Sequence, residues 1–414
     1  MSANEVPIDG ERLIGDLKRL REFGAFGTGV VRTSLSPVDV ESRHWLCGRL
    51  EEAGLDARFD GAGNVIGRSR NPGKAVLIGS HTDTQPTGGW LDGAMGVIYG
   101  LEVARALSEA PATKDRAVDV ASWLDEEGRF FGCFGSLSFV GGTPPHALEA
   151  TDSTDGTGLT LGDALRDAGL AGVAPELLDP DRHIAYLEAH IEQGPYLEEE
   201  GNRIGVVTSI VGSRNFLVEF EGEQNHAGTT PMARRRDAAH AMVDFAHAVY
   251  REFPAAAGDR SVWTIGEMTL EPNAMSIVPG KARLNLQFRD QDSAVLDRLE
   301  TLARDLLARA NEGPCAATMH TRKHHSIPAP MDANLRGHLE RAAERHAPDR
   351  WTSMPSAAVH DAQILADHLP SAMLFVPSIN GVSHAFEEDT SEADIVLGCQ
   401  VLATATASVL DESA

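Results

Sequence analysis

The sequence predicts an α/β protein in which a mixed sheet flanked by helices is interrupted by a smaller α+β domain. Short apolar runs alternate with amphipathic helical stretches near both ends of the chain, as strands and helices do in α/β sheets. Between about residues 213 and 326 the expected order changes to βαββαβ, which is the order of a ferredoxin-like domain. The length of 414 residues exceeds that of one typical domain, so more than one is expected.

The first segment, from about Glu11 to Leu55, is expected to be helical because leucines recur there at helical spacing. A sheet pattern begins at Val65, and a helix is expected to start just after Gly93. Residues 142–181 are rich in Gly, Pro, Thr and Asp and are expected to form a loop-bearing surface. Further strands are expected at residues 75–78, 117–123 and 184–190.

The middle of the chain has its own pattern of elements. Its strands are expected at residues 216–220, 262–270, 283–288 and 316–320, and its helices at residues 238–253 and 295–310. The α/β pattern then returns with a helix at residues 335–344, a buried strand at 372–376 and a closing helix at 393–410. We therefore expect one domain made of residues 1–212 and 327–414, interrupted by a second domain of residues 213–326.

The composition argues against several classes of function. The chain has 61 acidic and 36 basic residues, and its formal net charge of -25 repels phosphate backbones and anionic lipid, so we expect no nucleic-acid or membrane partner. No long apolar run is present, and the first residues show neither a basic region nor an apolar stretch, so neither a spanning helix nor a signal peptide is expected. The four cysteines lie far apart and form no CxxC pair, which fits a reducing cytoplasm.

Candidate metal ligands lie at the carboxyl ends of expected strands, where open α/β sheets bind their ligands. These residues are His81, Asp83, Asp92, Glu126, Glu127, His190 and His384. Histidines mixed with carboxylates, without thiolates, suit Zn, Mn, Co or Ni better than Mg or Ca, which prefer oxygen ligands. The alternative is a set of hydrogen-bonded loop histidines and turn-forming aspartates.

Two features of this set indicate hydrolytic metal chemistry. Two neighbouring ions need a bridging carboxylate, and Asp92 is placed to supply it. In the adjacent pair Glu126 and Glu127, one carboxylate can bind metal while its neighbour acts as general base on a water molecule. The alternative for this pair is a solvated acidic turn after a strand.

Several stretches, in the same order along the chain, resemble the M20 family of dinuclear metal peptidases and amidohydrolases. The resemblance is closest to the hydantoinase/carbamoylase branch, which contains N-carbamoyl-L-amino acid amidohydrolases, β-ureidopropionases and allantoate amidohydrolases. The stretches are GSHTDT at 79–84, DGAMGV at 92–97, EEG at 126–128, HIEQGP at 190–195, HAGTTPM at 226–232, PNA at 272–274, RD at 289–290, HDA at 360–362 and SH at 383–384. HIEQGP and HAGTTPM are specific to the branch, so the resemblance is strong.

The resemblance implies two divalent metal ions per subunit, each Zn, Mn, Co or Ni. The implied ligands are His81, Asp92 and His190 for one ion, and Asp92, Glu127 and His384 for the other. Asp83 would orient the imidazole of His81. Glu126 would take a proton from the metal-bridging water and pass it to the leaving nitrogen.

The resemblance also implies contacts to the substrate. His226 would reach an active site from the partner subunit of a homodimer and stabilise the developing oxyanion. Arg289 would clamp the substrate carboxylate through a bidentate contact. The other residues implied in substrate binding are Gln193, Asn273 and His360. From the residues alone, His226 could instead cap the inserted domain, and Arg289 could be a surface ion-pair residue.

We therefore expect a cytoplasmic, homodimeric amidohydrolase whose inserted domain serves dimerisation and closes as a lid over a small carboxylate-bearing ureido or amide substrate. The expected substrate is an N-carbamoyl-L-amino acid, hydrolysed to the amino acid, carbon dioxide and ammonia. Allantoate and N-carbamoyl-β-alanine are alternatives within the branch, and a dipeptidase or N-acyl amino acid hydrolase is an alternative within the fold. An alternative of another class is a non-catalytic metal- or metabolite-binding protein, which would not need a base such as Glu126.

Three residues near these motifs depart from the common pattern of the branch. Gln85 stands where a small apolar residue is frequent, Trp90 crowds the approach to Asp92, and Leu137 stands where many relatives carry Arg or Lys. None of them is an expected ligand, so the reaction class is unaffected and the substrate stays open.

Overall fold

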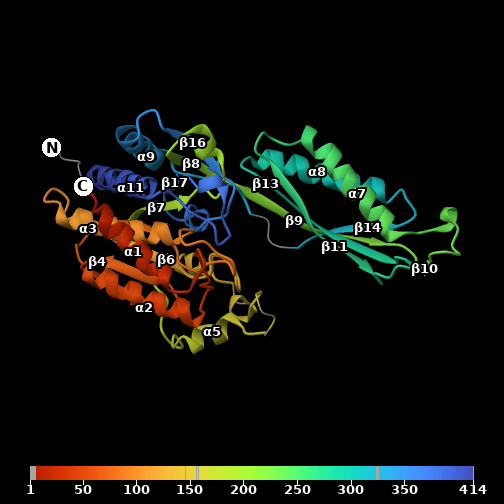
Figure 1. Cartoon of the computed structure of the whole chain (residues 1–414), viewed down its shortest axis with the longest axis horizontal. Helices are drawn as coiled ribbons and strands as arrows, with labels where there is room; N and C mark the ends of the chain where they lie inside the picture. Colours follow the sequence, from red (N-terminus) through yellow and green to blue (C-terminus); the bar gives the residue numbers. More distant parts are fainter. Residues whose placement is uncertain (1–5, 145, 155, 157, 323–325, 414) are drawn as a thin grey trace. The chain divides into compact units, whose positions relative to one another are not determined.

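In the computed structural model, the described residues are 6–144, 146–154, 156, 158–322 and 326–413. The chain divides into two compact units, one made of residues 1–208 with 330–414 and the other of residues 209–329. The first unit therefore contains both the red and the blue ends of the chain in Figure 1. Residues 1–5, on which the expectation of no signal peptide in part depends, lie outside the described residues.

The first unit is built on a nine-stranded mixed sheet. Across the sheet the strands follow the order β15 (Ala329–Pro330), β8 (Ile204–Ile210), β17 (Ser371–Val376), β7 (His183–Ile191), β5 (Ala75–His81), β6 (Ala117–Trp123), β4 (Val65–Ser69) and β3 (Leu55–Phe59), and β16 (Trp351–Ser356) pairs with β8. The four neighbours β17, β7, β5 and β6 are parallel, and β5, β6 and β17 are buried along their whole length. This burial explains their apolar sequences, because a parallel sheet is covered on both faces.

Helices pack around this sheet. They are α1 (Gly10–Glu22), α2 (Pro37–Glu52), α3 (Ala94–Glu109), α4 (Phe134–Phe139), α5 (Leu161–Asp167), α6 (Tyr196–Glu200), α9 (Ala333–His346), α10 (Asp361–Leu365) and α11 (Glu392–Glu412), with short 3-10 turns η1 (Ala147–Glu149) and η4 (Ile379–Gly381). Helix α3 packs on β5, β6 and β7, and α11 packs on α3, α9 and β17. Gly96 allows α3 to lie close to the sheet, because a Cβ there would fall 2.2 Å from the carbonyl oxygen of Ala189.

The segment expected to be helical from Glu11 to Leu55 is interrupted by a hairpin of β1 (Ala25–Phe26) and β2 (Gly29–Val30) between α1 and α2. Gly24, just after α1, has φ +83°, and a Cβ there would lie 2.3 Å from the carbonyl oxygen of Val31. Helix α2 restarts where the Ser36 hydroxyl accepts the N–H of Asp39. The prediction of continuous helix is therefore wrong at this hairpin, because glycine at a positive φ outweighs leucine spacing.

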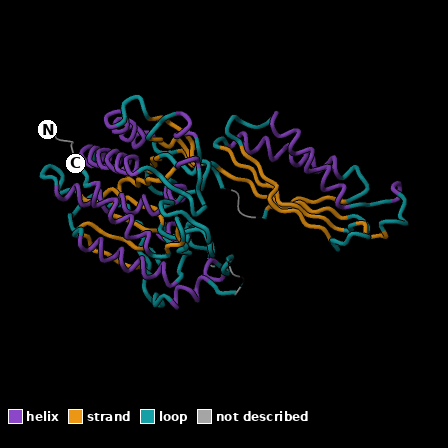
Figure 2. Tube along the Cα trace, viewed as in Figure 1, coloured by secondary structure: helices purple, strands orange, loops and turns teal. Residues whose placement is uncertain are grey.

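The second unit is an antiparallel sheet covered by two helices. Its sheet order is β11 (Val262–Glu271), β13 (Lys281–Asp290), β9 (Gly212–Glu221) and β14 (Ala316–Thr321), and its other elements are α7 (Ala238–Glu252), α8 (Ser293–Ala310), β10 (Asn225–His226), β12 (Ile277–Val278), η2 (Met232–Arg234) and η3 (Phe253–Ala255). Figure 2 shows α7 and α8 side by side over one face of this sheet, and Phe216, Phe220, Leu299 and Phe288 are among the core residues buried there. The chain order βαββαβ is the predicted ferredoxin-like order.

Among the described helices, α11 is long and apolar enough to cross a membrane by length and composition alone. The sequence expectation did not include such a helix. Its most apolar stretch has a mean hydropathy of 1.6, and 67% of that stretch is buried inside the structure. Packing against α3, α9 and β17 therefore accounts for the apolar character of α11.

Candidate active site

The candidate ligands come from the carboxyl ends of adjacent parallel strands in the first unit. His81 is the last residue of β5, His190 is next to last in β7, and Glu126 and Glu127 follow β6. His384 follows β17, which pairs with β7. Because these four strands are neighbours and run in the same direction, their ends meet at one edge of the sheet.

The structure brings the five predicted ligands together in two groups that share Asp92. One group is His81, Asp92 and His190, and the other is Asp92, Glu127 and His384; within each, the donor atoms lie within 4.8 Å of one another. Asp92 Oδ1 lies 3.1 Å from His190 Nε2 and 3.4 Å from His81 Nε2. Asp92 Oδ2 lies 3.5 Å from His384 Nε2. The two carboxylate oxygens of Asp92 thus face different groups, as a bridging ligand requires.

The electrostatics of this cluster fit divalent cations. Burial raises the pKa of Glu127 to about 7, and the nearby Asp92 carboxylate adds to that rise. Burial also raises the pKa of Glu126 well above its ordinary value, with a further contribution from Glu127. Burial alone would raise the pKa of Asp92 too, but the imidazole of His190 holds it well below the ordinary value. Crowded buried carboxylates beside imidazole nitrogens form a donor set that a divalent cation would neutralise.

Backbone carbonyls orient two of the imidazoles. His81 Nδ1 lies 3.0 Å from the carbonyl oxygen of Asp83, and His190 Nδ1 lies 2.9 Å from that of Ile191. A carbonyl can only accept a hydrogen bond, so Nδ1 carries the proton in both rings. Nε2 of each ring then faces the Asp92 carboxylate, on the side where a metal ion would bind, and Nε2 of His190 also accepts the backbone N–H of Gly93 at 3.0 Å.

Asp83 acts differently from the sequence expectation. Its carboxylate Oδ1 lies 3.8 Å from His81 Nδ1, so the carbonyl of Asp83 rather than its carboxylate orients the ring. Asp83 Oδ2 instead accepts the N–H of Glu127 at 3.4 Å. Arg43 Nη2 lies 3.7 Å from Asp83 Oδ1 and 3.2 Å from the carbonyl oxygen of Trp123, at the end of β6. These contacts connect the segment after β5 to the segment after β6.

Glu126 lies at this edge and belongs to neither donor group. Its Oε2 lies 3.5 Å from His81 Nε2, and its side chain is 9% exposed. The preceding residue, Asp125, has φ +59° and accepts the N–H groups of Phe130, Phe131 and Gly132 at 2.7–3.3 Å. Asp125 therefore fixes the turn that presents Glu126, a role that sequence reasoning missed.

A second residue that sequence reasoning missed is Glu388, which is 1% exposed. Its Oε1 accepts the N–H groups of Leu91 at 3.2 Å and Asp92 at 3.0 Å. The Ser383 hydroxyl lies 2.8 Å from Glu388 Oε2 and 3.0 Å from Asp92 Oδ2. Gly89 makes room for this carboxylate, because a Cβ there would lie 1.9 Å from Glu388 Oε1. The only sequence signal for Glu388 is an acidic run after His384, which resembles a solvated charge cluster.

Gln193 lies beside the bridging carboxylate. Its Nε2 donates to Asp92 Oδ2 at 2.8 Å and lies 3.4 Å from His384 Nε2. Its Oε1 is buried without a hydrogen-bond partner among the described residues. Gln193 has φ +59° and His384 has φ +53°, conformations that ordinary residues rarely adopt. Such strain is concentrated at functional sites, where it fixes side-chain direction.

His360, which was expected to contact the substrate, packs against His190, one of the candidate metal ligands. It is 1% exposed, and its ring centroid lies 4.6 Å from that of His190 in an edge-to-face arrangement. Its Nε2 lies 2.9 Å from the Ser356 hydroxyl. Burial and the nearby His190 hold the pKa of His360 well below its ordinary value. The structure therefore places His360 as a neutral support for the His190 ring.

The three remaining predicted residues belong to the second unit. His226 is exposed in β10, and its Nδ1 accepts the N–H groups of Gly228 at 3.0 Å and Thr229 at 3.1 Å. Arg289 is near the end of β13, and its Nε donates to Gln287 Oε1 at 3.1 Å. Asn273 has φ +54° in the turn after β11. Their part in substrate binding stays a prediction.

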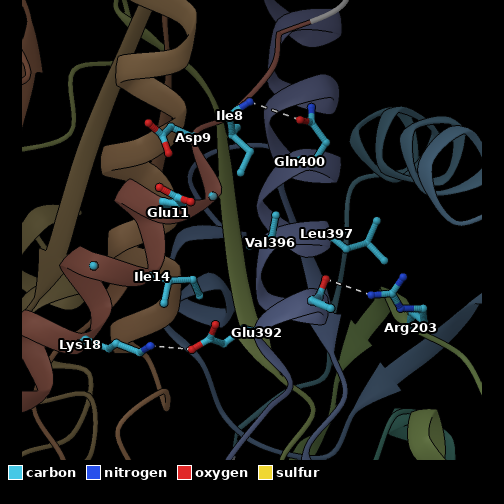
Figure 3. A pocket seen from close by; sticks show the side chains of 13 residues that line it. Ile8, Asp9, Glu11, Ile14, Lys18, Arg203, Glu392, Val396, Leu397 and Gln400 are labelled. Carbon is cyan, nitrogen blue, oxygen red and sulfur yellow. Dashed lines mark hydrogen bonds and ion pairs between the residues drawn. The ribbon is translucent and has the colours of Figure 1, made fainter.

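A groove with a volume of about 1190 Å³ lies between the start of α1 and the start of α11 (Figure 3). It is lined by Ile14, Lys18, Val396 and Gln400 among others, and Lys18 Nζ lies 2.7 Å from Glu392 Oε1 at its edge. None of the five candidate ligands lines it. The donor cluster rather than this groove is therefore the candidate active site.

Similarities to one protein family and to three known proteins bear on this site. The sequence profile of peptidase family M20/M25/M40 matches residues 77–408. The chain is 36% identical over 392 residues to an allantoate amidohydrolase of Escherichia coli (strain K12), covering 93% of this chain and 94% of that protein. It is 34% identical over 423 residues to an N-carbamoyl-L-amino acid amidohydrolase of Geobacillus stearothermophilus, covering 95% and 97%. A solved structure of an amidase of the hydantoinase/carbamoylase family from Burkholderia phymatum is 53% identical, with a TM-score of 0.90 and 98% of each chain covered.

Proposed function

This chain belongs to the peptidase family M20/M25/M40, and from that premise we propose that it is a dinuclear metal amidohydrolase that cleaves N-carbamoyl-L-amino acids. It is a hydrolytic enzyme acting on non-peptide C–N bonds. The main support for the proposed reaction is that the two donor groups share Asp92. Glu126 lies beside these groups and belongs to neither. A site that only held metal would not need that extra carboxylate.

The chemistry divides between the ions and Glu126. Divalent ions held by the two donor groups would lower the pKa of a water molecule and polarise the scissile carbonyl. Glu126 takes the proton of the attacking water and passes it to the leaving nitrogen, so the ureido C–N bond breaks as the water oxygen joins carbon. Burial raises the pKa of Glu126 well above its ordinary value, which suits a group that must hold a proton between these two steps. Cleavage of that one bond leaves a carbamic acid, which loses carbon dioxide as its remaining C–N bond breaks, so the products are the amino acid, carbon dioxide and ammonia.

The side chain of Gln193 favours a substrate that carries N–H groups. Its Nε2 is engaged by Asp92 Oδ2, and its buried Oε1 is an acceptor without a partner among the described residues. A buried acceptor left without a donor is costly. The terminal amide of a carbamoyl group offers such a donor, so Gln193 would orient the ureido nitrogen next to the bridging carboxylate.

His226 and Arg289 complete the proposal from the second unit. Because His226 Nδ1 accepts two backbone N–H groups, the proton of the neutral ring is on Nε2, as a donor to an oxyanion requires. We assign that donor to the active site of the partner subunit in a cytoplasmic homodimer. Arg289 would hold the substrate carboxylate with its guanidinium group, and Asn273 would assist.

Allantoate is the second candidate substrate, because the chain is 36% identical to the Escherichia coli allantoate amidohydrolase. Allantoate is a carboxylate with two ureido groups, so the same groups could bind it. N-carbamoyl-β-alanine differs from the first candidate by one methylene. A dipeptide would lack the terminal ureido nitrogen that Gln193 would bind.

A turnover panel separates these candidates. Protein loaded with Mn²⁺ or Zn²⁺ is given N-carbamoyl-L-amino acids, N-carbamoyl-β-alanine, allantoate and dipeptides, and ammonia and free amino groups are measured. We expect the highest kcat/KM with an N-carbamoyl-L-amino acid. A higher value with allantoate would assign the second candidate, and dipeptide cleavage without ammonia would indicate a peptidase. A panel without turnover, on protein that binds metal, would leave a binding function.

A further inference from the structure

The segment after β5 contacts Glu127 through two side chains besides providing the ligand His81. Asp83 Oδ2 accepts the N–H of Glu127 at 3.4 Å. Gln85 Nε2 donates to the carbonyl oxygen of Glu127 at 3.1 Å and to its carboxylate Oε2 at 2.8 Å. Glu127 is therefore held at its backbone N–H, its backbone carbonyl and its side chain by residues two positions apart.

We propose that Gln85 is a positioning residue for Glu127, and that it sets the affinity of the ion held by Asp92, Glu127 and His384. This inference rests on the proposed function, because it assumes that Glu127 is a metal ligand. Gln85 reaches the site only through Glu127 among the contacts described for its side chain. Replacement of Gln85 should leave the affinity of the ion held by His81, Asp92 and His190 unchanged.

The oxygen that Gln85 contacts is the one that faces the metal site. Glu127 Oε2 lies 3.6 Å from His384 Nε2, in the second donor group. A carboxylate oxygen has lone pairs for more than one partner, so Oε2 can accept the Gln85 amide and still face a cation. The second hydrogen of the same amide is directed at the Glu127 carbonyl, which fixes the side chain relative to its own backbone. The carboxylate is thereby pre-oriented before an ion arrives.

The amide suits this place because it donates without adding charge. A lysine or arginine would neutralise Glu127, whereas a glutamate would repel it. The small apolar residue that is frequent at this position in the branch would make neither hydrogen bond. Gln85 is half-buried, so its replacement leaves the core intact.

The bridging carboxylate does not depend on Gln85. Asp92 Oδ2 is contacted by Gln193 Nε2 at 2.8 Å and by the Ser383 hydroxyl at 3.0 Å. Its backbone N–H is held by Glu388. Loss of Gln85 should therefore act on one ion site and spare the other, which a general loss of stability would not do.

The test is calorimetric titration of metal-stripped protein with Zn²⁺. We expect two ions per chain in the wild type. In Gln85→Ala one affinity should stay unchanged, and the other should fall about 10- to 100-fold, the usual effect of losing a side chain that orients a ligand. Gln85→Asn should act in the same direction, because an amide one methylene shorter cannot keep both hydrogen bonds.

Two controls assign the effect. Gln400, which lines the groove in Figure 3, has a side-chain amide that also makes two backbone hydrogen bonds, with Ile8 and Val6. Gln400→Ala should change neither affinity. In a Glu127→Gln background, Gln85→Ala should have no further effect on zinc binding, because the metal ligand that Gln85 orients is already lost.

The two proposals fail in different ways. Unchanged zinc affinities in folded Gln85→Ala, or an equal fall in both affinities, would overturn the role of Gln85 and leave the proposed reaction standing. An absence of turnover with every substrate, while Gln85→Ala still weakens one ion, would overturn the proposed function and keep the positioning role. Wild-type protein that binds fewer than two ions would end both.

Discussion

Glu388 accepts the backbone N–H of Asp92 at 3.0 Å although 296 residues separate the two along the chain. The same carboxylate accepts the Ser383 hydroxyl next to His384. One buried glutamate thus holds the bridging ligand from the first half of the chain against a ligand from the last segment. The two donor groups depend on this contact for their mutual position.

Replacing Glu388 should weaken both ions. Glu388→Ala leaves the buried N–H groups of Leu91 and Asp92 without an acceptor, which costs about 1–3 kcal/mol for each group. We expect a lower melting temperature and loss of both ions on dialysis, read by metal analysis. Glu388→Gln keeps an acceptor for the N–H groups but not for Ser383, and should lie between Ala and the wild type. Retention of both ions by Glu388→Ala would contradict this reading.

Replacing Glu126 should stop turnover and leave metal binding intact. Glu126→Gln removes the group that moves the proton, and general acid-base catalysis of this kind contributes about 10²- to 10⁴-fold. We expect kcat to fall by that order with two ions still bound. Glu127→Gln is the matched variant, because it alters the adjacent ligand and should lose one ion. Unchanged turnover in Glu126→Gln would eliminate the mechanism.

Removing the metal should lower stability as well as activity. Without cations, the Asp92, Glu126 and Glu127 carboxylates are buried close together, so that Asp92 raises the pKa of Glu127, and Asp92 and Glu127 raise that of Glu126. Ions that bind only the folded chain stabilise it, by about 2.7 kcal/mol at a hundredfold excess over Kd. Chelation followed by calorimetry should show a lower melting temperature that Mn²⁺ or Zn²⁺ restores together with turnover. A melting temperature insensitive to chelation would argue against ions at this site.

Gly93→Ala should displace His81. Gly93 has φ +64°, and a Cβ there would lie 2.4 Å from atoms of the His81 ring. Gly141→Ala is the matched control, because Gly141 has φ +73° with nothing within 4 Å of its Cβ position. Alanine is strained at this positive φ, so both variants should lose about 1–3 kcal/mol of unfolding free energy. Only Gly93→Ala should also weaken zinc binding, as measured by titration.

Protonation of Asp119 should lower the free energy of unfolding at acid pH. Burial alone would raise the pKa of Asp119, but hydrogen bonds from Arg182 at 2.7 Å and from His183 at 3.2 Å hold it below the ordinary value. A carboxylate with a lowered pKa stabilises the fold above its ordinary pKa, about 3.9, and that contribution is lost as the pH falls through the folded-state value.

Chemical unfolding at several pH values checks this sign. Asp119→Asn leaves a mostly buried Arg182 uncompensated and should cost about 3 kcal/mol at pH 7. The difference from the wild type should shrink as the pH falls below about 4. Asp163→Asn, in an exposed pair with Arg166, is the control and should change stability little. A difference that grows toward acid pH would contradict the assignment.

The fold class and the family could be predicted from the sequence and are confirmed. The gathering of the candidate ligands could be predicted because most of them lie at or soon after the end of a short apolar strand, and parallel strands bring their ends to one edge whatever their separation along the chain. Their division into two donor groups came from the family resemblance. His384 shows the limit of this reasoning. Only the resemblance placed it with the second ion, since no spacing rule relates it to Glu127.

The supports of the site could not be predicted in the same way. Glu388 and Asp125 act by accepting backbone N–H groups, a role that depends on where loops turn and has no periodic signal. The resemblance implied that the Asp83 carboxylate orients His81, but this carboxylate lies 3.8 Å from His81 Nδ1 and accepts the backbone N–H of Glu127. The β1–β2 hairpin was missed because the leucines at helical spacing on either side of it were interpreted as one helical segment, although Gly24 ends the helix. In each case the local conformation or the side-chain role depends on a tertiary contact that the local sequence does not specify.

The place of β17 in the sheet has a consequence for how the protein is made. β17 lies between β7 and β8, yet the ribosome delivers it only after the whole second unit. At about 5–20 residues per second, the second unit can fold while β7 and β8 still lack their neighbour. The nascent chain therefore carries two open strand edges and an incomplete donor set until its final segment emerges. The ion held by Asp92, Glu127 and His384 can therefore bind only after the last segment is made, whereas His81, Asp92 and His190 all precede the second unit.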